Sequence, residues 1–416
     1  MRIGLFTDTY HPAVNGITYV VEITKRELEA LGHEVYVFAP TPQLRKYREL
    51  EKNVIRFPAI KDLFFEGQFT TMFFPPRAIK KIKSLNLDII HFFTPGQIGL
   101  LGSYAAIKNK TPLVAMYSTD LYEYVTHYPV VFPGMLALTM TAPIALKSRG
   151  PELKKTLSAL TPKRNVEAWS QNLVSEMITL LHNRCAAVIV PSIKVQKQLL
   201  EWQTESPIYL IPTGVDALKT DKQLSQRLKK RFDIGVGDKI ILYVGRLGSE
   251  KNIDLLINSF SLIKNQVPEA KFLIVGSGPH KAALESLTST RLLTDSVIFT
   301  GSIERRLLGS VYALASIFIF ASMTDTQGLV LNEAAHAGLP LVITDPEISE
   351  VVQNGQNGFY AQNNPQDLAQ KVTSIIKDPQ LAARMSNASF KISVQFNERG
   401  QTEKLVTIYN KIIDQD

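Results

Sequence analysis

Short apolar runs recur along the whole chain, and stretches with helical periodicity lie between them. Most of the runs are continuously apolar, which is typical of parallel strands covered on both faces of a sheet. In the first half they lie at residues 2–7, 34–39, 87–92, 112–117 and 186–191, and in the second half at residues 207–212, 239–245, 271–276, 297–301, 317–321 and 340–344. This alternation predicts an α/β fold built from doubly wound parallel sheets.

The alternation restarts near residue 206, and the length of 416 residues is ample for two domains. We expect an N-terminal domain at residues 1–205 and a C-terminal domain at residues 206–395, with a terminal helix at about 396–416 that packs back on the first domain. In open α/β sheets, ligands bind beyond the carboxyl ends of the strands. Two such domains that face each other would hold a ligand in the cleft between them.

The cysteine content and two apolar segments indicate the cellular compartment in which the protein works. Cys185 is the single cysteine, which excludes an internal disulfide and suits a reducing cytoplasm. The N-terminal residues do not read as a signal peptide, because Asp8 interrupts the apolar run too early. The longest uncharged stretch, residues 129–146, is broken by prolines and a glycine, so we expect no transmembrane helix.

The positive charge is concentrated in the first half of the chain. Residues 1–200 carry 24 Lys and Arg against 15 Asp and Glu, whereas residues 201–416 are nearly neutral. A basic half could meet nucleic acid, anionic lipid or an anionic substrate, or it could be a solvated surface that keeps the protein soluble. The sequence has no recognised nucleic-acid-binding motif, so we expect no nucleic-acid partner.

Strand-end loops of the second half carry residues that suit a diphosphate. Arg246 follows a strand, and Lys251 comes shortly after it near the start of a helix, so two cations and a helix N-terminus would form an anion site. The alternative is a pair of surface side chains. Gly276 and Gly278 follow the next strand and would let a ligand approach the backbone. The turn around Ile303 either borders a base-binding pocket or is only a turn.

The stretch 322–340 places two carboxylates around a strand-to-helix turn. Gly328 permits a tight turn, and the free N–H groups of the following helix point back at the loop, where they favour an anion. Glu333 could accept hydrogen bonds from both hydroxyls of a ribose, and Asp325 could accept from a sugar beyond the phosphates. Alternatively, Asp325 is a helix N-cap and Glu333 is an exposed helical acid.

The chain resembles the retaining glycosyltransferases of family four, which have the two-domain GT-B architecture. The second half carries GRLGSEKNID, VGSGP and DTQGLVLNEAAHAGLP, the last in place of the family's E-x7-E signature, and PTGVD matches the interdomain segment. The first half agrees through TDTYHPAVNGIT, LDIIHFFTPGQIGLLGSYAA and MYSTDLYEYVTHY. The similarity therefore spans nearly the whole chain.

The resemblance implies roles for individual residues. Arg246 and Lys251 would bind the diphosphate, Glu333 would hold the ribose, and Asp325 would contact the donor sugar. Of these, Asp325, Arg246 and Lys251 would form the catalytic set. Further donor contacts are implied for Gly16, Gly276, Gly278, Ile303, Gly328, Leu329 and Val330. On the acceptor side, the implied residues are Asp8, Tyr117, Ser118, Asp120 and His127.

Three positions depart from the family pattern. Asp325 stands where glutamate is usual, so its carboxylate reaches less far and the identity of the donor sugar is open. Asn15 stands where a second glycine is common, just before Gly16. Ser118 replaces a histidine that many relatives carry near the reacting centre, and serine supplies neither its charge nor its ring. His127, in a predicted helix, is either an acceptor-side residue or a partly buried helical residue.

The resemblance implies sugar transfer with retention of anomeric configuration, by front-face attack in which the leaving diphosphate takes the acceptor's proton. Negative charge grows on that diphosphate, and Arg246, Lys251 and the helix N-terminus could stabilise it. Many other transferases use a divalent metal held by a D-x-D pair, but here this motif occurs only at the extreme C-terminus. We therefore expect no metal and no cofactor, with the nucleotide sugar acting as a substrate.

Two features favour a membrane lipid as acceptor. The first domain is basic, and the apolar residues 129–146 precede a segment rich in Lys and Arg; the aromatic segment 62–83 also ends in basic residues. The alternative is a core helix beside a solvated basic face. The sequences of these motifs also resemble those in the branch of the family that makes glycosyl-diacylglycerols from UDP-glucose.

Three functions stay open from the sequence. The leading hypothesis is a cytoplasmic hexosyltransferase, peripheral on the inner face of the membrane, that moves a hexose from a nucleotide sugar to a lipid such as diacylglycerol, with UDP-glucose favoured as donor. One alternative is a soluble transferase with a polysaccharide or small-molecule acceptor. Because of Ser118 and Asp325, the other alternative is a non-catalytic protein that binds sugar nucleotides.

Overall fold

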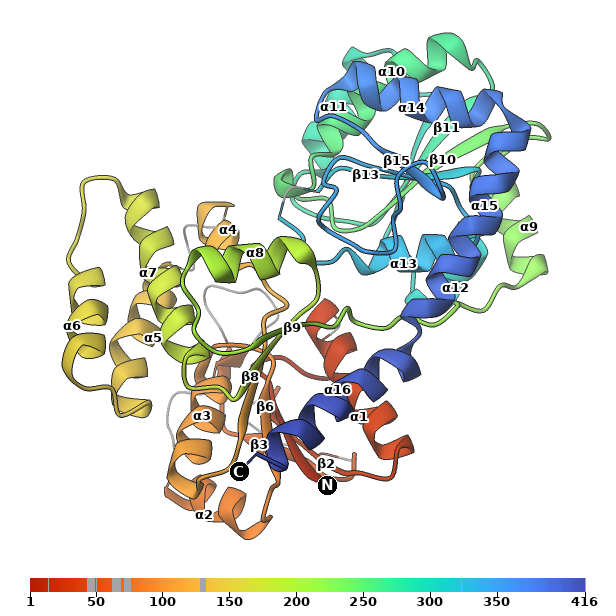
Figure 1. The fold of residues 1–416 in the computed structure, drawn as a ribbon. Coiled ribbons are helices and arrows are strands. Elements are labelled where there is room, and N and C mark those ends of the chain that lie inside the picture. The colour runs from red at the N-terminus through yellow and green to blue at the C-terminus, as the bar shows by residue number, and fades with distance from the viewer. Residues whose placement is uncertain are drawn as a thin grey trace. The chain divides into compact units, whose positions relative to one another are not determined.

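The computed structural model describes residues 1–13, 15–42, 49, 51–61, 69–70, 76–127, 132–322 and 324–415, without the side chains of residues 60, 61, 69, 70, 76, 124, 126 and 127. The chain divides into two compact units (Figure 1). The first consists of Met1–Thr213 and Glu398–Asp416, and the second of Gly214–Asn397. Each unit is built around its own parallel sheet.

A parallel sheet of seven described strands forms the centre of the first unit. In spatial order they are β3 (Val54–Phe57), β2 (Glu34–Pro40), β1 (Arg2–Phe6), β6 (Ile89–Phe92), β7 (Leu113–Met116), β8 (Ala187–Val190) and β9 (Ile208–Leu210). The chain winds outward from β1 in one direction and outward from β6 in the other. In sheets of this kind, the carboxyl ends of the two strands at the reversal point flank a crevice.

Helices connect and cover these strands. Those of the first unit are α1 (Gly16–Ala30), α2 (Pro76–Ser84), α3 (Gln97–Asn109), α4 (Leu121–His127), α5 (Phe132–Ala145), α6 (Gly150–Ala159), α7 (Val166–His182), α8 (Ile193–Glu201) and α16 (Glu398–Ile413). A short antiparallel pair, β4 (Ile60–Lys61) and β5 (Phe69–Thr70), lies outside the main sheet. In the buried core, Phe6 and Phe38 stack with their ring centroids 4.2 Å apart.

One predicted strand lies in the other sheet. The sequence pattern assigns residues 207–212 to the second domain, but β9 pairs in parallel with β8 and completes the first sheet. The first unit accordingly extends to Thr213 instead of ending at residue 205. Helix α8 joins β8 to β9 as an ordinary crossover would, so the β-α-β pattern continues without a break at this point. Periodicity alone cannot separate the last strand of one sheet from the first strand of the next.

The last helix, α16, belongs to the first unit although the second unit precedes it in the sequence. The hydroxyl of Tyr409 on α16 lies 2.5 Å from Nδ1 of His91, a buried residue of β6. At the start of α16, Glu398 accepts a 3.0 Å hydrogen bond from Tyr19 and pairs with Arg26, and both partners lie on α1. These contacts fasten the end of the chain to the first sheet and its covering helix.

The second unit has a parallel sheet of six described strands. In spatial order they are β12 (Val297–Gly301), β11 (Ala270–Val275), β10 (Lys239–Val244), β13 (Ile317–Phe320), β14 (Leu341–Ile343) and β15 (Gly358–Tyr360). Its helices are α9 (Lys222–Arg231), α10 (Ile253–Gln266), α11 (Lys281–Thr290), α12 (Arg305–Tyr312), α13 (Leu329–His336), α14 (Pro365–Lys377) and α15 (Pro379–Ser393), with 3₁₀ turns η2 (Ser249–Lys251) and η3 (Val394–Phe396). Winding reverses between β10 and β13. The predicted fold class of two doubly wound, Rossmann-like sheets is confirmed.

Helices α4 to α7 lie between β7 and β8 in the sequence, and both α5 and α6 pack on α7 (Figure 1). Helix α5 holds most of the uncharged stretch 129–146; within the described ranges, no helix is long and apolar enough to cross a membrane. Of the aromatic segment 62–83, only residues 69–70 and 76–83 are described. There, helix α2 buries its apolar residues and exposes its basic ones.

Candidate active site

The loops that follow β10, β11 and β12 are joined by backbone hydrogen bonds at the carboxyl edge of the second sheet. Leu247 donates its N–H to the carbonyl of Ser277 and accepts the N–H of His280, both at 2.9 Å. The N–H of Gly276 donates to the carbonyl of Gly301 at 3.0 Å. These bonds give the loop after β10 a rigid support.

Two of the predicted site glycines are required by this close approach of loops. A Cβ atom at Gly276 would lie 1.8 Å from the carbonyl oxygen of Gly245, and one at Gly278 would lie 2.3 Å from that of Leu247. From the sequence, both glycines are expected to admit a ligand to the backbone. In the structure they admit the neighbouring loop. The nearby Ile303 is half-buried against the core of the unit.

Arg246 is held in place by a buried acid. Its Nη2 lies 2.5 Å from Oε1 of Glu250, which is almost fully buried in η2. The intervening Gly248 leaves room for this carboxylate, because a Cβ there would lie 2.2 Å from Glu250 Oε2. The hydroxyl of Tyr243 donates to the carbonyl of Arg246 at 3.1 Å, and burial raises the pKa of Tyr243 well above its ordinary value, which keeps this donor protonated.

Lys251 and Asp325, which lie far apart in the sequence, meet in the structure. Nζ of Lys251 lies 2.6 Å from Oδ1 of Asp325. Both side chains are largely shielded, so solvent screens this ion pair only in part. The pair therefore brings together a residue predicted to bind the diphosphate and a residue predicted to bind the sugar, at the carboxyl ends of the strands.

Glu333 is buried, so the alternative that it is an exposed helical acid is wrong. Its Oε2 accepts a 2.8 Å hydrogen bond from the hydroxyl of Tyr312, and its Oε1 pairs with the guanidinium of Arg305. Helix α12 supplies both partners. The side chain of Arg305 is 37% exposed, whereas that of Glu333 is 1% exposed.

Helix α13 begins directly after Gly328. This residue is the N-cap, with a φ of 66°, a left-handed conformation that favours glycine, and its carbonyl accepts the N–H of Leu331 at 2.8 Å. The alternative that Asp325 caps this helix is therefore wrong. Leu329 and Val330 form the first turn, where helical N–H groups have no partner within the helix and attract an anion.

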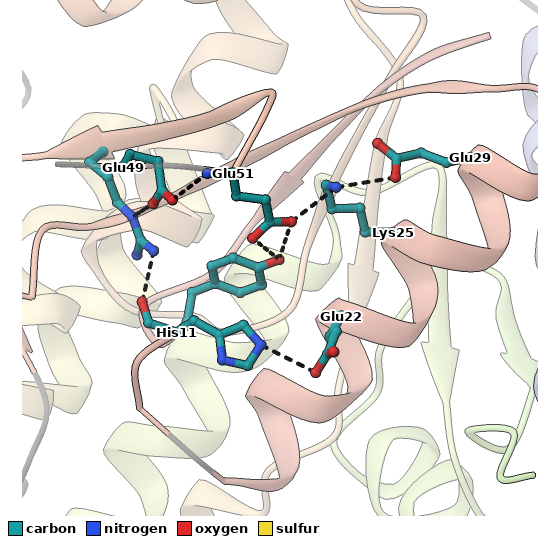
Figure 2. Close-up of polar contacts among 8 residues, drawn as sticks. His11, Glu22, Lys25, Glu29, Glu49 and Glu51 are labelled. Carbon is teal, nitrogen blue, oxygen red and sulfur yellow. Dashed lines mark hydrogen bonds and ion pairs between the residues drawn. The ribbon is translucent and has the colours of Figure 1, made fainter.

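Charged and aromatic side chains hold the loop between β1 and α1 in the first unit (Figure 2). The hydroxyl of Tyr10 lies 3.1 Å from Glu51, which also pairs with Lys25 of α1 at 3.0 Å. Arg56 of β3 donates to the carbonyl of His11 at 2.7 Å, and its guanidinium lies over the ring of Tyr10. The loop is thus tied both to the helix that follows it and to a neighbouring strand.

Asp8 and Asn15 lie in the same loop, and each accepts a hydrogen bond from the start of a helix. The carboxylate of Asp8, predicted on the acceptor side, accepts the N–H of Ile98 at 2.8 Å at the start of α3, and burial raises the pKa of Asp8. Asn15 is the N-cap of α1, because its Oδ1 accepts the N–H of Thr18 at 2.9 Å. This cap explains an asparagine where a second glycine is common. Gly16 follows it, and a Cβ there would meet nothing within 4 Å.

Tyr117, at the carboxyl end of β7, is buried in the core of the first unit. Its ring lies edge-on to His182 and Trp202, with centroid distances of 5.4 and 6.2 Å. Its ring therefore belongs to the core of the first unit, and its acceptor-side role stays a prediction. Ser118, directly after it, is half-buried.

Asp120 is also buried, and it is hydrogen-bonded within the first unit. It accepts from the side-chain amide of Gln198 at 3.2 Å and from the N–H of Glu123 at 3.3 Å, and burial raises its pKa. His127 is the last residue of α4, and its side chain lies outside the described residues. In the part of the chain that the structure describes, no group of three His, Cys, Asp or Glu residues could hold a metal ion.

Two family models match the chain, and together they span most of its length. The model described as Glycosyltransferase Family 4 matches residues 14–218, and the model described as Glycosyl transferases group 1 matches residues 225–392. The chain belongs to glycosyltransferase family 4. It is a hexosyltransferase, so the family and the enzyme class predicted from the sequence are confirmed.

Relatives of this glycosyltransferase match most or all of its length. It is 27% identical to the alpha-monoglucosyldiacylglycerol synthase of Acholeplasma laidlawii, over 100% of this chain and 98% of that one. The synthase of the same name from Streptococcus pneumoniae is 29% identical, over 88% of this chain and 76% of that one. The crystal structure of Anabaena Alr3699/HepE in complex with UDP covers 99% of this chain and 100% of its own, with a TM-score of 0.71 at 16% identity, which shows the shared fold.

Sequence reasoning missed three residues of the glycosyltransferase that hold predicted site residues. Glu250 lies only four residues after Arg246, and this closeness in the sequence is a signal that could have suggested the pair. Arg305 and Tyr312 contact Glu333 from a separate helix. Nothing in the sequence marks those two contacts, because they depend on how α12 packs beside α13.

Proposed function

We propose that this glycosyltransferase transfers a hexose, with retention of anomeric configuration, from a nucleoside diphosphate sugar to a membrane lipid, with UDP-glucose as donor and diacylglycerol as acceptor. The observation that carries the proposal is the similarity to two synthases named for monoglucosyldiacylglycerol, one of them matched along its whole length. The sequence motifs favour the same branch of the family.

Fixed positive charge supports a diphosphate site at the carboxyl edge of the second sheet. Arg246 is oriented by a buried carboxylate, and Lys251 stands beside Asp325. The first turn of α13 adds N–H groups with no helical partner. A preorganised set of donors and cations of this kind stabilises charge that develops on a leaving group. We assign Arg246, Lys251 and α13 to the diphosphate, Asp325 to the sugar and Glu333 to the ribose.

In the proposed reaction, the bond between the anomeric carbon and the diphosphate oxygen breaks. A bond between the anomeric carbon and the acceptor hydroxyl forms on the same face of the sugar. The proton of that hydroxyl passes to the departing diphosphate, so charge and atoms balance without a separate base. Lys251, which touches Asp325 at 2.6 Å, would hold the sugar-side carboxylate in place while it neutralises the leaving group.

The surface of the first unit supports an acceptor in an anionic bilayer on the cytoplasmic side. Met140 and Ile144 of α5 and Leu157 of α6 are exposed apolar residues, and Ile144 is 78% exposed. Exposed basic residues flank them in the sequence: Lys147, Arg149, Lys154, Lys155, Lys163 and Arg164. Apolar side chains beside Lys and Arg suit the interface of an anionic membrane. Helix α2 supports only the charged part of this interaction, because its apolar residues face inward.

Transfer assays test the proposal. Purified enzyme is incubated in EDTA with each of a panel of nucleotide sugars and with anionic vesicles that contain or lack diacylglycerol. A glycolipid formed from UDP-glucose only in vesicles with diacylglycerol supports the proposed donor, acceptor and metal independence together. Transfer to a soluble acceptor, or tight binding of a nucleotide sugar without any turnover, would contradict it and favour one of the two alternative functions.

A further inference from the structure

The proposed ribose ligand, Glu333, is enclosed in a way that raises a question about access. Its side chain is 1% exposed, although a ribose must reach it from outside. The residue that contacts it and is itself exposed is Arg305, at 37%. The other contact, Tyr312, is fully buried. The two partners of one carboxylate thus lie in different surroundings, one open to solvent and the other in the core.

Helix α12 presents both partners from one face. Arg305 is its first residue and Tyr312 its last, and residues seven positions apart lie on the same side of a helix. Tyr312 donates to Oε2 of Glu333 at 2.8 Å, while the Arg305 guanidinium pairs with Oε1. Each oxygen of the carboxylate therefore has one donor supplied by the protein.

We propose that Tyr312 is a permanent positioning residue for Glu333, whereas Arg305 is an exchangeable cover whose place is taken by the ribose diol of the bound nucleoside diphosphate. This inference rests on the proposed function, because it requires a nucleotide at this site. It goes further by naming how the site selects ribose over deoxyribose and what satisfies the carboxylate when no nucleotide is bound.

The hydrogen-bonding capacity of the carboxylate supports the exchange. An ionised carboxylate has about four acceptor positions. Tyr312 occupies one of them on Oε2, and Arg305 occupies one on Oε1 while it shields the group from water. When Arg305 moves aside, both oxygens can accept from a vicinal diol while Tyr312 keeps the carboxylate oriented. A buried carboxylate without hydrogen-bond donors would lower the stability of the folded enzyme. Arg305 avoids this cost when no nucleotide is bound.

The surroundings of Tyr312 suit a fixed donor. Its ring packs at 6.0 Å from that of Phe318 on β13, inside the core of the second unit. Burial, together with the charge of Glu333, raises the pKa of Tyr312 well above its ordinary value, so the hydroxyl keeps its proton at every physiological pH. The side chain is fully buried, so its hydroxyl stays on Glu333 whether or not a nucleotide is present.

The test measures binding of UDP and of 2′-deoxy-UDP to the full-length enzyme by isothermal titration calorimetry, with GDP and ADP and their 2′-deoxy forms tried where UDP does not bind. A hydrogen bond to a charged group is worth a factor of about ten or more in affinity, so wild-type enzyme should prefer the ribonucleotide by about tenfold. Tyr312→Phe should reduce this preference to below about threefold. Arg305→Ala should keep or increase it, while the melting temperature of the empty enzyme falls.

A matched control is Tyr360→Phe. It removes a partly buried hydrogen bond from a tyrosine hydroxyl to the carbonyl of Val352, in the same unit but outside α12. It should leave the ribose preference unchanged. If Tyr312→Phe lowers only the melting temperature and keeps the preference, its role is structural and the inference is overturned. If Arg305→Ala abolishes the preference, Arg305 is a fixed partner and the exchange is overturned, a result that stands even where Tyr312→Phe does not fold.

Failure of the underlying function has a different signature. Wild-type enzyme that binds no nucleoside diphosphate would remove the proposed donor site itself. If the wild-type enzyme prefers the ribonucleotide and Glu333→Ala keeps that preference, the assignment of Glu333 to the ribose is wrong. The proposed donor site is then unaffected. Loss of the preference in Glu333→Ala together with its loss in Tyr312→Phe supports the inference.

Discussion

Substitutions in the ion pair of Lys251 and Asp325 should distinguish the residue that binds the nucleotide from the residue that acts in sugar transfer. The two charged groups approach to 2.6 Å, and their side chains are 14% and 26% exposed. Exposed ion pairs contribute about 0.2–1 kcal/mol, while breaking a buried pair costs about 3–5 kcal/mol. For a pair of intermediate shielding, we expect a coupling of about 1–2 kcal/mol in the free energy of unfolding.

A double-mutant cycle measures this coupling. Urea unfolding is followed for Lys251→Ala, Asp325→Ala and the double variant, and the transition of the second unit is compared. The control is the cycle for Lys281 and Glu285, an exposed pair in the same unit, where we expect a coupling below about 0.5 kcal/mol. A coupling for Lys251 and Asp325 as small as that of the control would refute the pairing.

The same variants should differ in function. Lys251→Ala removes a cation from the diphosphate site and no longer offsets the negative charge of the neighbouring Asp325, so UDP affinity should fall by about ten- to a hundredfold. Asp325→Ala leaves the cation in place, so UDP affinity should stay within about threefold while the rate of sugar transfer falls. Calorimetry with UDP and a transfer assay with UDP-glucose check both. Equal loss of UDP affinity in the two variants would contradict the assigned roles.

Four further outcomes are expected. Glu333→Ala should weaken UDP binding by about tenfold or more, measured by calorimetry, and an unchanged affinity would remove it from the donor site. Gly278→Ala would place a Cβ 2.3 Å from a backbone carbonyl, so both the melting temperature and UDP affinity should fall; retention of both contradicts the loop packing. Burial lowers the pKa of His91 to about 3, so between about pH 8 and pH 5 this residue takes up a proton in the unfolded chain but not in the folded one. The contribution of His91 to the free energy of unfolding of the first unit should therefore fall by roughly 2 kcal/mol over this range. A free energy of unfolding that rises toward pH 5 in urea titrations would contradict this. Ile144→Glu should reduce binding to anionic vesicles in a flotation assay, whereas Val236→Glu, a fully exposed site in the second unit, should not; equal binding by both would argue against the proposed membrane surface.

The architecture follows from the sequence because it depends on local patterns. Continuous apolar runs separated by helical stretches specify strands that are covered on both faces, and both sheets are parallel as expected. The assignment of β9 was wrong for the same reason, since the pattern is local and sheet membership is not. Which strand pairs with which depends on contacts between segments distant in the sequence.

The candidate site was predictable to a similar degree. Motifs predict Arg246, Lys251 and Asp325 as site residues, and the structure brings the last two into contact. A residue that holds a predicted site residue was missed where it comes from another helix, as with Tyr312, which contacts Glu333. Asp8 is implied on the acceptor side only by the family resemblance, and the structure adds a contact within the fold that no motif marks, because its carboxylate accepts the N–H of Ile98 at the start of α3. A sequence motif gives the type of side chain, and packing decides what that side chain contacts.

The most direct test of the proposed function is the structure of the product. Enzyme, UDP-glucose and diacylglycerol vesicles are incubated in EDTA, and the lipid extract is examined by mass spectrometry and by NMR of the anomeric proton. We expect a monoglucosyldiacylglycerol with an α linkage, since the donor is α-linked and the configuration is retained. A β-linked product would contradict retention, and the absence of any glucolipid would contradict the proposed acceptor.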